Sequence, residues 1–183
     1  MEDFISERLQ GLILAFTTSP GIEAWLWSGG ILILLVVVVL PIGFRTGFVR
    51  VELMTGGRGR FALLALLLAI RPSLLEELIF RALFIPHPAQ GYPLRITLLW
   101  AGVGLFVFIL FHPINGLFIH RSARSLFTDP LFLTFAGLLG IACTAAYLIS
   151  GSIWPPMIIH WLAVTPWILL LGGGSALFTK GSR

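Results

Sequence analysis

Five long apolar segments, separated by short polar ones, dominate this chain of 183 residues. A helix needs about 20 mostly apolar residues to cross a membrane, and each segment approaches that length. The segments are residues 23–44, 61–85, 96–119, 131–150 and 153–173. Charged residues make up only 11% of the chain, whereas about 25% is usual in a soluble domain. The sequence therefore predicts an all-α fold, a polytopic integral membrane helical bundle of about five transmembrane helices.

The polar segments divide the chain into four expected parts. Residues 1–18 hold a short apolar stretch without a basic start, which favours an interfacial N-terminal helix over a cleaved signal peptide. Residues 19–60 comprise the first transmembrane helix and a cytoplasmic loop, residues 61–175 a core of four helices, and residues 176–183 a tail. Prolines inside three of the apolar segments are potential kinks, because each removes a backbone donor. They are Pro41, Pro72 and Pro113.

The positive charges predict an orientation in the bilayer. With five spans, the arginines of residues 45–60, those of residues 121–124, and Lys180 all fall on one side. Cytoplasmic loops carry an excess of Lys and Arg, so we expect the N-terminus outside and the C-terminus in the cytoplasm, in a plasma membrane of bacterial type. The net charge of +4 does not indicate a nucleic-acid partner, because the arginines form no basic stripe. The single cysteine, Cys143, excludes an internal disulfide and is interpreted as a helix-packing residue.

Two adjacent carboxylates, Glu76 and Glu77, lie with Arg81 inside the second apolar segment. Ionisable groups at membrane depth cost several kcal/mol unless they are paired, and by default they mark a functional site. Glu77 and Arg81 are four residues apart, so on a helix they share a face and can form an ion pair. Glu76 is turned by about 100° from Glu77 and can point into a cavity. A purely structural Glu–Arg pair is the alternative interpretation.

His112 and His160 are the other two candidates for a site, each inside a separate apolar segment. Hydrolysis can use a carboxylate that takes a proton from water, an imidazole that holds the water, and a second imidazole that donates to the oxyanion. Two histidines with carboxylates can also bind zinc or iron. The chain lacks the His-Glu-x-x-His spacing that places two ligands on one helix face, so we expect no metal and no other cofactor.

These motifs, in this order, resemble the glutamate-dependent intramembrane proteases of the CAAX protease and bacteriocin-processing family. That family carries Glu-Glu-x-x-x-Arg, Phe-x-x-x-His and His-x-x-x-Asn or Asp on successive transmembrane helices. Residues 76–81 match the first motif and residues 108–112 the second. The resemblance implies that residues 61–175 are the catalytic core. It further implies roles for five residues: Glu76 activates water, His112 assists it, Glu77 and Arg81 order the site, and His160 lies at the oxyanion.

The third motif departs from the family pattern, because Val164 stands four residues after His160. Valine cannot donate a hydrogen bond to an oxyanion. Asn115, the only asparagine in the chain, is a possible replacement donor from another helix. Alternatively, Val164 marks a slow enzyme or one that has lost catalysis.

The expected function is therefore an intramembrane endopeptidase that cleaves a membrane-associated peptide or protein with glutamate-activated water. One alternative is a catalytically inactive family member that acts as a membrane scaffold or binds peptides. The other is a metal-dependent membrane hydrolase. The identity of the substrate, whether it is prenylated, and the oligomeric state are left open.

Overall fold

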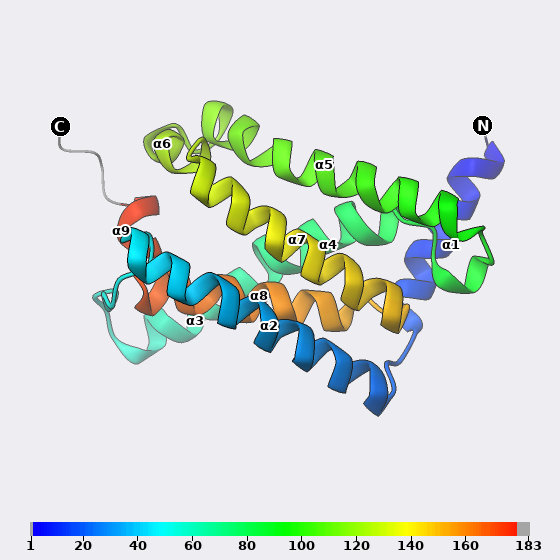
Figure 1. Cartoon of the computed structure of the whole chain (residues 1–183), viewed down its shortest axis with the longest axis horizontal. Coiled ribbons are helices and arrows are strands. Elements are labelled where there is room, and N and C mark those ends of the chain that lie inside the picture. The colour runs from blue at the N-terminus through cyan, green and yellow to red at the C-terminus, as the bar shows by residue number, and fades with distance from the viewer. Residues whose placement is uncertain (1, 179–183) are drawn as a thin grey trace.

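The computed structural model describes residues 2–178 and shows a bundle of helices. The five longest are α1 (Glu2–Thr17), α2 (Ile22–Thr46), α5 (Leu94–Phe118), α7 (Pro130–Ser150) and α8 (Trp154–Leu170). Of these, α2, α5 and α7 are long and apolar enough to cross a membrane, and α8 is a shorter apolar helix. Figure 1 shows these four helices running along the long direction of the molecule. The predicted all-α membrane bundle is confirmed.

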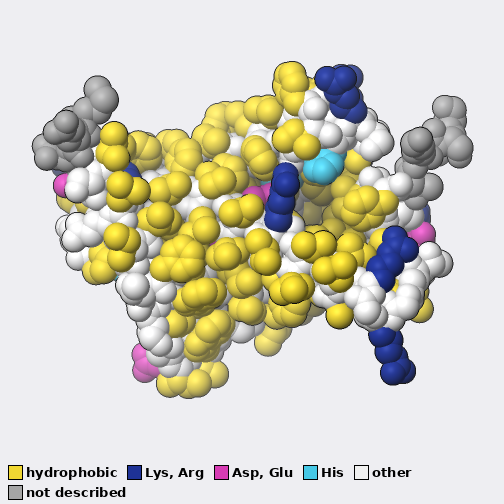
Figure 2. Space-filling view, turned by 180° about the vertical axis from the view of Figure 1, so that it is seen from behind, with side chains coloured by type: hydrophobic (Ala, Val, Ile, Leu, Met, Phe, Trp, Pro, Cys, Tyr) yellow, Lys and Arg dark blue, Asp and Glu magenta, His cyan; other side chains and the backbone are white. Residues whose placement is uncertain are grey.

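The surface of the bundle is mostly hydrophobic, as Figure 2 shows for one face. Helix α2 illustrates the pattern, because Ser28, Leu35 and Gly43 are its only buried residues. Its large apolar side chains, among them Ile33, Leu34 and Val37, are exposed. Exposed apolar patches of this extent are unfavourable in water and favourable in contact with lipid.

The second predicted span is not one continuous helix. Helix α3 (Arg58–Leu68) leads into wide π-helical turns at Ala69–Leu74, followed by α4 (Leu75–Glu77) and further π-helical turns at Leu78–Leu83. Arg71 leaves the helical conformation, with φ −137° and ψ 110°. It precedes Pro72, whose ring disfavours the helical region for the residue before it. The kink expected at Pro72 is thus a break in the helix, shortly before Glu76.

Helix α7 contacts α2, α5 and α8. Its buried side is rich in small residues, which let membrane helices approach closely. These residues are Ala136, Gly137, Gly140, Ala142, Cys143 and Ala146. The close packing around α7 allows groups from several helices to meet near its middle.

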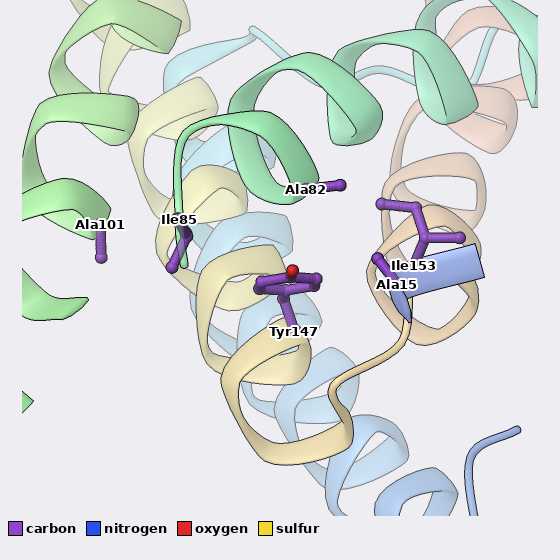
Figure 3. Close-up of a cluster of buried hydrophobic side chains, with 6 residues drawn as sticks. All are labelled: Ala15, Ala82, Ile85, Ala101, Tyr147 and Ile153. Carbon is purple, nitrogen blue, oxygen red and sulfur yellow. The ribbon is translucent and has the colours of Figure 1, made fainter. Parts of the chain in front are cut away.

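A cluster of buried apolar side chains closes one end of the bundle. Figure 3 shows its six members, which are Ala15, Ala82, Ile85, Ala101, Tyr147 and Ile153. Ala15 belongs to α1, and its carbonyl accepts a hydrogen bond of 2.9 Å from the backbone of Ile153. Helix α1 is therefore packed onto the end of the bundle through one side, while Ile5, Leu9 and Ile13 on its other side are exposed.

The segment between α2 and α3 is more ordered than the expected polar loop. Its backbone runs beside the end of α8, and Glu52 and Met54 donate hydrogen bonds of 3.0 and 2.9 Å to the carbonyls of Leu170 and Leu169. Helix α9 (Gly173–Phe178) lies at the same end and contacts the turn at Arg121–Ala123. The two arginine-bearing segments thus share one end of the bundle (Figure 1). Lys180 lies outside the described residues.

Candidate active site

Glu77 is the centre of a buried polar network between the broken span and α8. Its side chain is fully buried, and its Oε1 accepts a hydrogen bond of 3.0 Å from Arg81 Nη1. The same oxygen is 2.7 Å from Nδ1 of His160, whose side chain is 3% exposed. Because a carboxylate only accepts hydrogen bonds, Nδ1 carries the proton. The spacing of four residues explains the Glu77–Arg81 pair, and the packing of α8 adds His160.

Arg81 connects this network to α5 and α7. Its Nη2 donates a hydrogen bond of 2.9 Å to the carbonyl of Gly140, and its guanidinium lies 4.6 Å from the centre of the Phe108 ring. The approach to α7 depends on the missing side chain of Gly140. A Cβ there would lie 3.3 Å from Arg81 Nη2 and only 2.6 Å from Leu105 Cδ1. The buried guanidinium is thus satisfied by a carboxylate, a carbonyl and an aromatic face.

Glu76 is held less tightly than its neighbour. Its side chain is 15% exposed, and no described residue forms a hydrogen bond with its carboxylate. Its Oε2 lies 3.8 Å from Nε2 of His160. That distance is too long for a direct hydrogen bond, but a water molecule about 2.8 Å from each atom could join them. Because Glu77 fixes Nδ1 of His160, the opposite ring nitrogen is the one turned toward Glu76.

His112 lies on α5 and is surrounded by aromatic rings. Its Nδ1 donates a hydrogen bond of 2.8 Å to the carbonyl of Phe108, one helical turn earlier. The Phe108 ring lies 4.8 Å from His112 and 6.3 Å from His160, so it is the shared neighbour of the two imidazoles. Among the described residues, no hydrogen bond or ion pair joins His112 to Glu76. With Nδ1 protonated, Nε2 of the neutral ring is a free acceptor.

Val164, which stands at the last position of the third motif, and Asn115, its possible replacement, have different surroundings. Val164 packs against an apolar cluster that includes Leu35, Cys143 and Ile159, between α2, α7 and α8. Asn115 lies three residues after His112, and its Oδ1 is buried without a hydrogen-bond partner among the described residues. Within the described chain, no hydrogen bond joins its amide to Glu76 or His160.

Cys143 is closer to the site than the sequence indicated. It is fully buried, its thiol donates to the carbonyl of Pro156 at 3.5 Å, and it forms with Glu77 and His160 a group whose ligand atoms lie within 4.8 Å of one another. These three residues could in principle hold a metal. The Glu77 oxygen already accepts from the Arg81 cation, and His160 Nδ1 carries a proton toward it. This donor set fits an ion-pair network better than a metal centre, and His112 does not belong to it.

Comparison with known proteins agrees with the motifs. The family model described as type II CAAX prenyl endopeptidase Rce1-like matches residues 58–165. No curated protein and no solved structure matches the chain significantly. The matched region covers more than half of the chain and contains both glutamates, Arg81, His112 and His160. The chain therefore belongs to the Rce1-like family of type II CAAX prenyl endopeptidases.

Proposed function

We propose that the protein is an intramembrane endopeptidase in which Glu76 activates water for attack on a peptide bond. The observation that carries this proposal is the asymmetry of the glutamate pair. Glu77 is buried and bonded to Arg81 and His160, whereas Glu76 is partly exposed and faces Nε2 of His160 across 3.8 Å. A free carboxylate beside an oriented imidazole, in a site shielded from bulk solvent, is suited to general base catalysis.

The proposed reaction uses one water molecule and the side chains of this site. Glu76 takes a proton from the water, whose oxygen bonds to the carbonyl carbon of the scissile peptide. The carbonyl oxygen becomes an oxyanion and accepts a hydrogen bond from protonated His160 Nε2. The C–N bond then breaks, and Glu76 returns its proton to the leaving nitrogen. Hydrogen-bond donors placed where the oxyanion develops commonly contribute the largest share of rate enhancement in acyl transfer.

Glu77 and Arg81 position His160 in this scheme. A carboxylate on Nδ1 fixes the orientation of an imidazole and stabilises positive charge on the ring, as in catalytic triads of hydrolases. Arg81 neutralises Glu77, so the buried carboxylate retains a compensating cation when His160 is neutral. Both are therefore positioning residues.

His112 and Asn115 complete the proposed site from α5. The unoccupied Nε2 of His112 can accept a hydrogen bond from the attacking water. Asn115 would supply the second oxyanion donor that Val164 cannot. Its position on α5, three residues after His112, and the donor N–H groups of its side-chain amide support this role.

The substrate is proposed to be a membrane-associated peptide or protein, and the charges of the chain suggest how the enzyme lies in the membrane. Excess positive charge marks the cytoplasmic side of a membrane protein. The arginine-bearing segments at one end of the bundle support an orientation with the N-terminus outside and the C-terminus in the cytoplasm.

A second candidate function follows from Val164. Its apolar environment leaves the third family motif without its polar residue, which suits an inactive family member that binds peptides without cleaving them. In that case the carboxylate of Glu76 would be dispensable for the biological activity.

The test compares the N-terminal peptides of cells that carry the wild type with those of cells that carry Glu76→Gln. New protein N-termini in wild-type cells alone would support the protease and identify its targets. Glu23→Gln, at an exposed glutamate in the first turn of α2, is the matched control and should behave as wild type. Identical N-termini in all three strains would favour the peptide-binding function.

A further inference from the structure

His87 is a buried histidine that the proposed reaction does not use. It lies in the segment between the broken span and α5, and only 4% of it is exposed. Its Nε2 is 2.6 Å from the carbonyl oxygen of Gly151, in the turn between α7 and α8. Its Nδ1 is 3.1 Å from the backbone nitrogen of Ala89. The ring thus joins two turns that are 64 residues apart in the sequence.

These two contacts require the neutral form of the ring. The carbonyl of Gly151 can only accept a hydrogen bond, so Nε2 carries a proton. The backbone N–H of Ala89 can only donate, so Nδ1 has none. A second proton on His87 would place two donors face to face at Nδ1. It would also leave a charged ring buried in the protein, which is unfavourable without a partner of opposite charge.

The titratable groups on the surrounding elements do not supply such a partner. Among the described side chains, no carboxylate lies within 4.0 Å of His87. On α7, the Tyr147 ring packs edge-on against the imidazole, with the ring centres 6.3 Å apart. Helix α1 contributes Arg8, which is itself a cation, and Glu7, whose carboxylate accepts a hydrogen bond from Tyr92. The turn before α8 has no titratable side chain. A proton on His87 would therefore be an uncompensated charge.

His87 and Gly151 adjoin the two elements that carry the proposed catalytic pair. His87 follows Glu76 by eleven residues, just after the broken span, and Gly151 precedes His160 by nine, just before α8. The 3.8 Å between Glu76 Oε2 and His160 Nε2 depends on how these two elements are placed against each other. The contact between His87 and Gly151 ties them together at one end.

The residues beside this contact are packed tightly enough to transmit its position. Ile85 and Ile153 lie two residues from His87 and Gly151, and both are at most 1% exposed, within the apolar cluster of Figure 3. Gly151 has φ +61°, and a Cβ there would lie 3.3 Å from His87 Nε2, so the short distance between the two turns depends on a glycine. Because protein interiors are close-packed, a shift at this contact displaces the groups packed against it.

We propose that His87, when neutral, is a positioning residue that clamps the end of the broken span to the start of α8 and so sets the gap between Glu76 and His160. This proposal rests on the proposed peptidase function. Displacement of a catalytic group by about 1 Å can cost about 10²-fold in rate. An imidazole gains its proton between about pH 8 and pH 5. The clamp is therefore complete at about pH 8 and is lost as the pH falls, and cleavage declines with it.

The experiment compares the pH profiles of kcat for wild type and His87→Gln. The substrate is a peptide taken from the cleavage sites that distinguish wild-type from Glu76→Gln cells. Glutamine offers an amide N–H and a carbonyl oxygen but does not titrate, so it can replace both contacts of the neutral ring. The two enzymes should have similar kcat at about pH 8. Between about pH 8 and pH 5, the wild type should lose about tenfold more activity than His87→Gln.

Two further variants separate this role from a purely structural one. His87→Phe keeps an aromatic ring but neither hydrogen bond, so kcat should fall about tenfold at every pH while KM stays unchanged. The midpoint of thermal unfolding at about pH 8 shows whether this variant is still folded. His120→Gln, at an exposed histidine just after α5, is the matched control and should keep the wild-type pH profile.

Several results would overturn the proposal. They are a His87→Gln enzyme that loses activity in acid as the wild type does, a folded His87→Gln enzyme that is inactive at about pH 8, and a His87→Phe enzyme with lower stability but wild-type kcat. The first result would assign the loss in acid to Glu76, His112 or His160. All three leave Glu76 essential, whereas an active Glu76→Gln enzyme would instead reject the peptidase mechanism itself.

Discussion

The site has two halves that differ in how firmly their carboxylates are held. The fixed half consists of Glu77, Arg81 and His160, which are all at least 97% buried and joined by hydrogen bonds of 2.7 to 3.0 Å. The free half consists of Glu76 and the residues of α5 near it in the proposed site. Glu76 is partly exposed and has no hydrogen bond to a described residue, and the hydrogen bond of the His112 ring goes to its own helix. Neighbours in sequence thus have opposite environments. One carboxylate is held against an imidazole and a guanidinium, and the other has no hydrogen-bond partner among the described residues.

The fixed half is not explained by stability alone. Taking an ion pair out of water costs several kcal/mol per ion, and well-packed apolar residues can be as stable or more so. A buried Glu–Arg pair that also binds His160 is better explained by the orientation that it gives the imidazole. The two halves therefore predict different consequences of mutation, loss of chemistry in one and loss of folding with chemistry in the other.

The largest effect on activity is expected for Glu76→Gln. The substitution keeps the size of the side chain but removes the base, and positioned general bases contribute about 10² to 10⁴ in rate. The kcat for an identified peptide should fall by about that factor, while the midpoint of thermal unfolding in detergent stays unchanged. A large drop in unfolding temperature would show that Glu76 also belongs to the fixed half, and the comparison would fail.

Arg81→Met should lower stability as well as activity, whereas Glu76→Gln should lower activity alone. Arg81→Met leaves the Glu77 carboxylate buried without its cation, and breaking a buried pair from one side costs about 3–5 kcal/mol. Unfolding measured with a chemical denaturant should show this loss. Arg81→Lys is the control and should lose less, because it keeps the charge but not the planar fork that reaches both Glu77 and Gly140.

A double variant sharpens this test. Glu77→Gln in the Arg81→Met background removes the orphaned charge, so part of the lost stability should return. Cleavage should not return, because His160 still lacks its carboxylate partner. Recovery of activity together with stability would show that the network contributes to folding only.

Residue spacing predicted the local part of the site, whereas its long-range part was expected only from the resemblance to the family motifs. The Glu77–Arg81 pair follows from a spacing of four residues on a helix. The bond between Glu77 and His160 joins residues 83 positions apart, and it depends on how α8 packs against the broken span. No periodicity in either segment contains that information. Cys143 was expected only to pack, for the same reason.

Proline illustrates the limit for the fold. Pro41 and Pro113 lie within the continuous helices α2 and α5, whereas the helix is broken at Pro72. Membrane helices tolerate proline where neighbouring groups satisfy the freed backbone, so the outcome depends on surroundings that a sequence does not display. The apolar lengths, in contrast, placed residues 23–44 and 131–150 within two residues of α2 and α7.

A smaller loss of activity is expected for Asn115→Ala, which addresses the free half. If its amide donates to the oxyanion, kcat should fall by about 10²-fold without a matching loss of stability. His160→Ala is the reference and should abolish cleavage. Unchanged kcat in Asn115→Ala beside an inactive His160→Ala would show that the loss at Val164 is not compensated from α5.

The smallest effect is expected at the glycine that lets Arg81 reach α7. A Cβ at Gly140 would meet Leu105 Cδ1 at 2.6 Å, and overpacking of this kind typically costs about 1–3 kcal/mol. Gly140→Ala should therefore lower the free energy of unfolding, and it should lower kcat only as far as Arg81 and Glu77 shift. Gly102→Ala is the matched control on α5, since a Cβ at that position would have no neighbouring atom within 4 Å. A stability loss with unchanged kcat would mean that the position of Arg81 tolerates adjustment, so the rigidity of the fixed half would reside in the Glu77–His160 bond itself.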